Sequence, residues 1–184
     1  MHNDYSGTST LEFSTITLNS AANGSGVYKE NVVSPFSSGG PGSVNTRNTI
    51  IALHIKSTDG VNSEVFGSFN SFGYNLIGDS TGSTGFSATG DIVGTSDSPI
   101  DPRLGALGFY GGSTQTIALL PDSPAIDAGD PNLVETDPKT DQRGFPRVSG
   151  ERVDKTDTFT FTKIGYNENK RSFDFGGSPV NYSC

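Results

Sequence analysis

The chain has 184 residues and a formal net charge of −8, and 32% of its residues are hydrophobic. This length suits one domain with its own core rather than two. Basic residues form no cluster that could neutralise a run of phosphates, so we expect no nucleic-acid partner. No segment approaches the roughly 20 apolar residues of a membrane-spanning helix, and the first residues lack the basic and apolar regions of a signal peptide. The single cysteine, Cys184, excludes an internal disulfide and a cysteine-based metal site.

Apolar residues in this sequence follow a strand pattern rather than a helical one. Leu11, Phe13, Ile16 and Leu18 recur through a Thr-rich run with high β propensity. Further along, short apolar pairs are each followed within a few residues by Gly, Asp or Pro, which are turn residues. These pairs are Leu76-Ile77, Ile92-Val93, Leu119-Leu120 and Ala125-Ile126. The pattern predicts an all-β fold of many short strands.

Residues 13–20 and 48–55 resemble successive copies of one structural unit. Pairing Ile16 with Ile51 gives a shift of 51 − 16 = 35 residues and sets Asn19 opposite His54. A repeat of this length is typical of a solenoid, in which each coil packs on the next. We therefore expect Ile16 and Ile51 to lie one above the other in adjacent coils.

Three motifs carry a resemblance to a known family: SFGYNLIGD at 71–79, SPAIDAG at 123–129 and TDQRGFPR at 140–147. They resemble the C-terminal coils of bacterial surface proteins with a right-handed parallel β-helix, called choice-of-anchor Q domain proteins. The resemblance covers residues 7–154. It implies an all-β, right-handed parallel β-helix of about three to four coils over residues 1–154, as the end of a longer solenoid. Residues 155–184 form a divergent tail, with an edge strand expected over 157–165 and weak order beyond it.

The resemblance also implies roles at the coil corners. In this family an Asn bends the strand through the left-handed region and stacks on the Asn of the next coil. Asn19 and Asn75 fit this corner or ladder role, whereas His54 departs from it. The Gly that often precedes this corner is Leu18 in one copy and Leu53 in the other. After the second copy of the repeat, a run of aromatic residues favours an interior stack over a ligand platform. Its members are Phe66, Phe69, Phe72 and Tyr74.

Asp127, Asp130, Asp137 and Asp141 are candidate calcium ligands. Ca²⁺ takes six to eight oxygen ligands, and carboxylates from adjacent loops could converge on it. Asp beside Gly and Pro also shapes turns through side chain to backbone hydrogen bonds, and we favour this structural interpretation. Apart from this calcium site, we expect no cofactor.

The resemblance assigns the last two motifs to coil closure. Ser123, Asp127 and Asp141 would cap backbone groups, and Arg143 would bridge loops.

Polysaccharide cleavage is an alternative function, because right-handed β-helices include pectate lyases and glycoside hydrolases. A lyase of this type needs a base to remove the proton next to a uronate carboxylate. Arg47, Lys56 and Arg103 are the central candidates, and none lies beside an acidic cluster in the sequence. A hydrolase needs two carboxylates at a set separation, and no closely spaced Asp pair lies on the expected strands.

The function we favour is non-enzymatic: an adhesin-like, surface or secreted bacterial module that binds a polysaccharide or a cell-surface protein along a flat face. The parent protein is expected outside the cell or on its surface, although this chain carries no signal peptide. The first coil lacks an N-terminal cap, so we also expect self-association through an open solenoid end. A truncated gene product without activity of its own is the third alternative.

Overall fold

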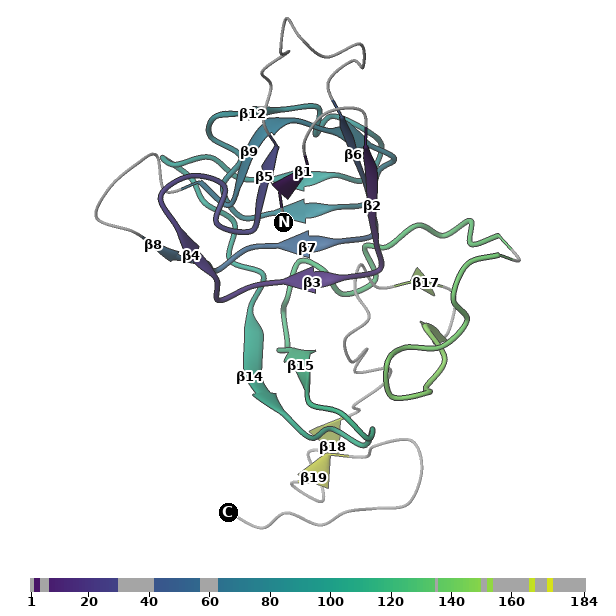
Figure 1. Cartoon of the computed structure of the whole chain (residues 1–184). Coiled ribbons are helices and arrows are strands. Elements are labelled where there is room, and N and C mark those ends of the chain that lie inside the picture. Colours follow the sequence, from purple (N-terminus) through teal and green to yellow (C-terminus); the bar gives the residue numbers. More distant parts are fainter. Residues whose placement is uncertain are drawn as a thin grey trace, which may run out of the picture.

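The computed structural model describes residues 2–3, 7–29, 42–56, 63–134, 136–149, 152–153, 166–167 and 172–173. Throughout these residues the protein consists of short strands, turns and loops without a helix, which confirms the all-β prediction (Figure 1). Accordingly, no helix in this part of the chain is long and apolar enough to cross a membrane.

Parallel strands form three main sheets. The first sheet has the order β10-β6-β2, with β2 (Thr8–Glu12), β6 (Ser43–Arg47) and β10 (Asn70–Ser71). The second has the order β13-β11-β7-β3, with β3 (Thr15–Ile16), β7 (Ile50–Ile51), β11 (Leu76–Ile77) and β13 (Ile92–Val93). The third has the order β1-β5-β9-β12, with β1 (His2–Asn3), β5 (Val27–Lys29), β9 (Val65–Ser68) and β12 (Ser83–Thr84). From β2 to β12 the chain visits the first, second and third sheets in turn three times, and it then enters the second sheet again at β13.

The remaining strands form two-stranded sheets. A parallel pair, β4 (Ser20–Ala21) and β8 (Ile55–Lys56), lies between the second and third sheets in chain order. The antiparallel pairs are β14 (Leu104–Gly108) with β15 (Thr116–Leu119), β16 (Val148–Ser149) with β17 (Arg152–Val153), and β18 (Tyr166–Asn167) with β19 (Ser172–Phe173). The edge strand expected over 157–165 lies outside the described residues.

Register in the second sheet confirms the predicted repeat and shows how it changes. Ile16 is the parallel partner of Ile51, which is the expected shift of 51 − 16 = 35 residues. The next step pairs Ile51 with Ile77, a shift of 26 residues, and the last pairs Ile77 with Val93, a shift of 16. The second sheet therefore keeps its register while the segments that connect its strands become shorter.

The two central strands of the second sheet, β7 and β11, are buried on both faces. Ile51 and Ile77 point to one face, in a cluster with Leu11, Val44, Val65 and Phe69 from the other two sheets and neighbouring turns. Ile50 and Leu76 point to the other face and pack with Leu119 of the β14–β15 hairpin. A strand buried on both faces needs consecutive apolar residues, which explains the apolar pairs in the sequence. Each fully buried Ile or Leu contributes about 1.5–3 kcal/mol.

Only part of the aromatic run lies in this interior. Phe69 is buried and packs on Phe86, with ring centroids 4.9 Å apart. Phe66 is half-buried and stacks on Tyr28 at 5.4 Å. Tyr74 is half-buried, whereas Phe72 is 59% exposed. The predicted interior stack is therefore confirmed for Phe69 and wrong for Phe72.

A polar ladder lies at the corner that precedes the second sheet. Ser14, Thr49, Asn75 and Asp91 occupy equivalent positions there, by the same shifts of 35, 26 and 16 residues. Thr49 N donates to Asn75 Oδ1 at 3.2 Å, and Asn75 Nδ2 donates to Asp91 Oδ1 at 3.0 Å and to Ser71 Oγ at 2.9 Å. Asn75 is fully buried, so these bonds satisfy an amide that water does not reach.

Asn19 and His54 lie at the opposite corner, after the second sheet. Asn19 N donates to His54 Nδ1 at 3.0 Å, which confirms that the two residues face each other in adjacent repeats. The left-handed residues there are Leu18 (φ 60°) and Leu53 (φ 58°), so the left-handed role expected for Asn19 and His54 is wrong. Asn75 does take part in a ladder, but this ladder lies at the corner before the second sheet. The left-handed residue at that corner is Tyr74, which precedes Asn75.

This assignment predicts unequal effects of two Asn substitutions. Asn75→Ala removes a buried amide that joins three rungs, and we expect it to lower the free energy of unfolding by about 2–3 kcal/mol. Asn19→Ala keeps the backbone N–H that binds His54 and removes only an exposed side chain, so we expect a change within about 0.5 kcal/mol. Urea unfolding followed by circular dichroism measures both, and equal effects would contradict the assignment.

Candidate functional site

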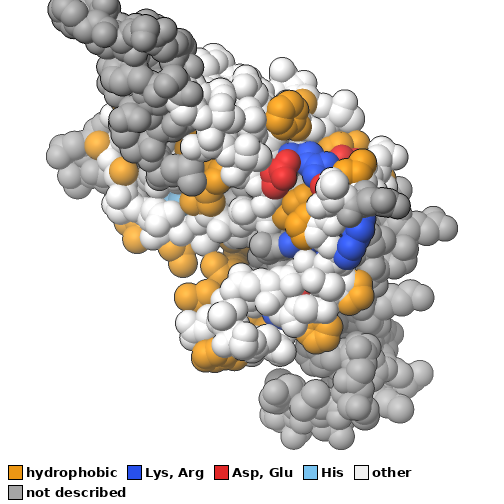
Figure 2. Space-filling model, turned by 45° about the vertical axis from the view of Figure 1, so that its right-hand side comes forward, with side chains coloured by type: hydrophobic (Ala, Val, Ile, Leu, Met, Phe, Trp, Pro, Cys, Tyr) orange, Lys and Arg blue, Asp and Glu red, His pale blue; other side chains and the backbone are white. Residues whose placement is uncertain are grey.

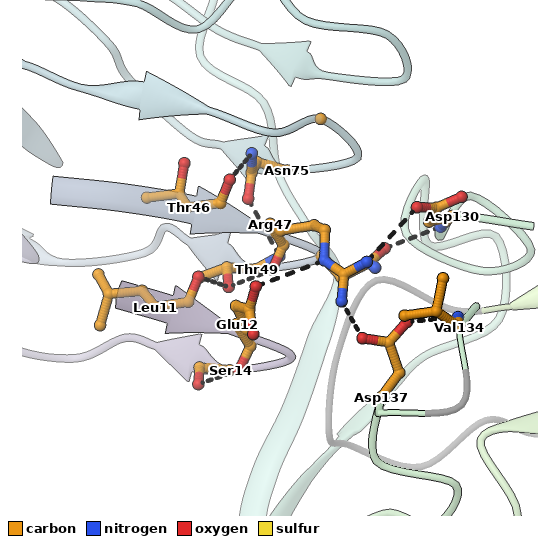
Figure 3. A network of polar contacts seen from close by, with 12 residues as sticks. Leu11, Glu12, Ser14, Thr46, Arg47, Thr49, Asn75, Asp130, Val134 and Asp137 are labelled. Atoms are coloured by element: carbon orange, nitrogen blue, oxygen red, sulfur yellow. Dashed lines mark hydrogen bonds and ion pairs between the residues drawn. The ribbon is translucent and has the colours of Figure 1, made fainter. Parts of the chain in front are cut away.

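A group of four charged side chains lies where β6 ends, beside the described part of the loop between Asp127 and Arg147 (Figure 3). Because side chains alternate along a strand, Thr46 points inward and Arg47 points outward from the first sheet. The Arg47 guanidinium hydrogen-bonds Asp137 through Nη2, lies 3.8 Å from Asp130 Oδ2, and places Nε 3.5 Å from Glu12 Oε1. We call these four residues the Arg47 cluster.

Burial strengthens the charge pairing in the Arg47 cluster. The side chains of Arg47 and Asp137 are 16% and 5% exposed. Burial is the largest single effect and disfavours the charged form of each, but the hydrogen bonds and the attraction of the neighbouring opposite charges together outweigh it, so the pKa of Arg47 is raised and that of Asp137 is lowered. Both groups therefore stay ionised at neutral pH, and the pair joins the end of β6 to a loop 90 residues further along the chain.

Two further contacts hold this loop. The buried ring of Phe13 has the Arg47 guanidinium 5.1 Å from its centroid and the Arg147 guanidinium 4.9 Å from it, both within cation–π range. Asp130 N donates to Asn48 Oδ1 at 2.8 Å. Several contacts therefore hold residues 130–147 against the corner that precedes the second sheet.

Three of the four residues assigned to coil closure, namely Ser123, Asp141 and Arg143, make the expected turn contacts. Ser123 Oγ donates to Pro102 O at 2.6 Å and accepts from Ala125 N at 3.2 Å. Asp141 accepts from Arg143 N at 2.8 Å and from Arg143 Nε at 2.7 Å. Arg143 Nη1 reaches Tyr110 O at 3.2 Å, so Arg143 bridges two loops as expected.

The four Asp residues proposed as calcium ligands are distributed over three environments. Asp130 and Asp137 face Arg47, Asp141 binds Arg143, and the exposed Asp127 lies beside a groove. Among the described residues, no group of three or more His, Cys, Asp or Glu side chains is placed to hold a metal ion. Calcium binding at these positions stays a prediction.

The three basic residues proposed as catalytic candidates lie on different elements. Arg47 ends β6 and is held by carboxylates. Arg103 is exposed in the turn before β14, has a φ of 51°, and its N donates to Asp101 Oδ1 at 2.7 Å. Lys56 ends β8, and its side chain lies outside the described residues. Arg47 therefore has a structural task that a free catalytic base would not have.

An open groove of about 510 Å³ lies beside the polar ladder. It is lined by Tyr74, Gly90, Asp91, Ile92, residues 127–129 and Pro131. Asp91 Oδ2 accepts from Ser71 Oγ at 2.6 Å and from Ala88 N at 3.0 Å, while Oδ1 accepts from Asn75. This carboxylate is saturated by protein donors, which suits a structural role better than proton transfer.

Sequence reasoning missed Glu12, Thr49 and Asp91. The shifts of 26 and 16 residues, which align Thr49 and Asp91 with Asn75, are visible only in the structure, so no spacing in the sequence marked these two residues. The Arg47–Glu12 contact follows from the 35-residue register, which makes these two residues direct partners on β6 and β2.

His54 is a buried, neutral histidine. Its side chain is 1% exposed, its Nδ1 accepts the Asn19 N–H, and its Nε2 lies 3.5 Å from Glu64 Oε2. Burial lowers the pKa of His54 to about 4. Since Nδ1 is an acceptor, the imidazole is the tautomer with a proton on Nε2, directed toward Glu64.

Comparison of the chain with protein-family models, with curated proteins and with solved structures gives no match.

The Arg47 cluster predicts a stability defect on truncation. Arg47→Ala leaves the Asp137 carboxylate buried without its cation, and we expect a loss of about 2–4 kcal/mol in the free energy of unfolding at pH 7. Because Arg47 depresses the pKa of Asp137, the difference between the variant and the parent should shrink as pH falls and Asp137 becomes protonated. The exposed Arg103→Ala serves as the control, with a change within about 0.5 kcal/mol. Equal stability of the two variants in urea unfolding would contradict the role of Arg47.

His54 predicts a loss of stability in mild acid. Its folded pKa of about 4 is below its ordinary value of 6.5, so the unfolded chain takes up the proton first. The contribution of neutral His54 to the free energy of unfolding is therefore fully present above pH 6.5 and is lost as pH falls toward 4. The loss is at most about 3 kcal/mol. The ion pair that protonated His54 can form with Glu64 reduces this loss.

His54→Asn is the matched variant, because an Asn side chain does not titrate and still offers an oxygen to the Asn19 N–H. Thermal melts of both proteins between pH 4 and 7.5 should show a steeper acid loss for the parent. Parallel curves would show that His54 is not buried in its neutral form.

Proposed function

We propose that this chain is a non-enzymatic module of a bacterial surface protein, which binds an extended glycan along the outer face of its first sheet. In this proposal the sheets form the coils of a right-handed parallel β-helix of the choice-of-anchor Q type. The parallel pairing of equivalent strands and the return of the chain to the same three sheets support the solenoid. The handedness and the surface location come from the sequence resemblance.

The observation that carries the binding proposal is an ordered set of polar side chains on the first sheet. On the outer face, Thr8 Oγ1 lies 3.0 Å from Ser43 Oγ, and Asn70 Nδ2 donates to Asn45 Oδ1 at 3.1 Å. Thr10 is the register partner of Asn45, so Thr10, Asn45 and Asn70 form one row across the sheet. Val44 and Thr46, which alternate with them on β6, are buried.

This geometry suits a glycan because the groups repeat at fixed spacings. Rows on neighbouring strands are about 4.8 Å apart, and residues two apart on one strand are about 7 Å apart. Hydroxyl and amide groups can both donate to and accept from sugar hydroxyls. Since neighbouring side chains already hold one another, they lose little conformational entropy when a ligand binds. Many weak contacts along the face then add up to useful affinity.

The enzymatic alternative has less support. Arg47 lies in a network of three carboxylates, and the Asp91 carboxylate beside the groove is saturated by protein donors. Neither group is available for proton transfer in this arrangement. Of the two lyase candidates whose side chains the structure describes, Arg47 and Arg103, Arg103 is the exposed one.

Substitution of the row tests the binding face. A triple variant with Thr10→Ala, Asn45→Ala and Asn70→Ala removes one complete row, and we expect it to lose at least about tenfold in glycan affinity, while each single change costs much less. The measurement is retention on immobilised bacterial and plant polysaccharides, followed by titration with oligosaccharides of the best one. The matched control is Ser68→Ala with Thr84→Ala, a hydroxyl pair 3.3 Å apart on the third sheet.

Two outcomes would contradict this proposal. One is glycan binding that the triple variant and the control variant lose equally. The other is calcium-dependent release of unsaturated product from pectate or alginate, measured by ultraviolet absorbance, that disappears in Arg103→Ala or Lys56→Ala. The second result would identify the lyase alternative and its base.

A further inference from the structure

An exposed aromatic ring lies next to the polar row of the first sheet. Phe72 directly follows β10, and its N–H donates to Thr46 O at 2.8 Å, so the parallel ladder with β6 continues through Phe72. Because side chains alternate along a strand, Phe72 is on the same face as Asn70, about 7 Å further along. Phe72 is 59% exposed. Its ring therefore stands among the outward polar groups of this sheet.

The ring of Phe72 has no visible task within the protein. Phe69 packs on Phe86, and Phe13 has two guanidinium groups within cation–π range. Phe72 makes neither a ring contact nor a cation–π contact with any residue that the structure describes. Covering an exposed apolar ring removes its surface from water, which is favourable. A ligand that lies on Phe72 would gain this free energy.

The charges around this row disfavour an acidic ligand. Register places Phe72 opposite Arg47, which is the partner of Glu12. The Arg47 side chain is 16% exposed and is held by Asp137, whereas the Glu12 side chain is 40% exposed. The charge that a ligand meets on this face of the sheet is therefore mainly negative.

The loop beside the row does not reverse this sign. It adds Asp130, Asp137 and Lys139 to Glu12 and Arg47, which gives three negative and two positive groups and a charge of −1. Figure 2 brings forward the side on which β2 and β6 lie in Figure 1. Charged side chains lie close together there and border hydrophobic ones, and much of the described surface around them is uncharged. With a net charge of −8 for the whole chain, a polyanion would be repelled within a Debye length, about 8 Å at physiological salt.

We propose that Phe72 is the stacking platform of the glycan site, and that this site takes uncharged pyranose sugars rather than uronates or sulfated sugars. The apolar face of a pyranose ring lies on Phe72, where its C–H groups meet the negative face of the aromatic ring. The next sugar in the chain then lies over the row of Thr10, Asn45 and Asn70, whose hydroxyl and amide groups bind its hydroxyls. This inference rests on the glycan-binding function proposed above.

Matched pairs of oligosaccharides test the substrate class. The probes are β-linked mannan and glucan oligosaccharides, each beside its C6-oxidised uronate counterpart of equal length, so that the members of a pair differ in the carboxylate. We expect the uncharged member to bind at least about tenfold more tightly in low salt, as measured by titration calorimetry. The preference should narrow as added salt screens the repulsion, which a purely steric cause would not produce.

Substitution of the ring tests the platform. Phe72→Ala should weaken binding of the uncharged oligosaccharide about tenfold, because the sugar loses the apolar surface beneath it. Phe72→Trp keeps an aromatic face and should bind at least as well as the parent. Phe109→Ala is the matched control, since Phe109 is 71% exposed beyond the end of β14, and it should leave binding unchanged. Urea unfolding of all three variants should keep the midpoint of the parent, because both rings are exposed.

Three results would overturn this inference while the proposed function stands. In each of them the uncharged oligosaccharide binds and the triple variant of the polar row loses it. The first result is that Phe72→Ala binds as the parent does, the second is that Phe109→Ala loses as much affinity as Phe72→Ala, and the third is that the uronate binds at least as tightly as its uncharged counterpart. No binding of any tested glycan, or binding that the triple variant retains, would contradict the proposed function together with this inference.

Discussion

The fold depends on one arrangement: aliphatic pairs that stack in parallel register through a sheet buried on both faces. Ile50 and Ile51 on β7 illustrate it, because one side chain packs against the hairpin and the other fills the space between the three sheets. A one-residue slip would exchange the two faces, and at the end of the sheet it would direct Thr15 into the interior. The register of the remaining strands follows from this constraint.

The polar ladder complements the apolar columns. Every return of the chain to the second sheet requires a sharp corner, and a corner leaves backbone groups that the sheets do not pair. Asn75 satisfies two of them at once, because its Oδ1 accepts from Thr49 N and its Nδ2 donates to Thr46 O, while Nδ2 also donates to the Asp91 carboxylate. Its position also explains why Asp91 is a poor catalytic candidate, since that carboxylate ends the ladder and receives its hydrogen bonds.

Sequence reasoning could predict the repeat of 35 residues because residues 13–20 and 48–55 share a pattern, and because apolar pairs with turn residues are local signals. It could not predict the shifts of 26 and 16 residues, since loop length is free to vary while strands stay in register. Left-handed Leu18 and Leu53 were also beyond local reasoning, because the cost of that backbone for Leu is met by surrounding structure. The Arg47–Asp137 contact joins residues 90 apart, and no spacing in the sequence marks it.

Contraction of the repeat gives the two ends of the parallel stack different properties. At β13 the repeat is 16 residues long, and the chain passes from there into the hairpin and into the loop held by Arg47, so its own later segments cover that region. At β3 the repeat is 35 residues long, and the side chains of β3 are half-buried, as those of β13 are. Because the two ends differ in size, stacking of identical copies end to end would match a wide cross-section with a narrow one.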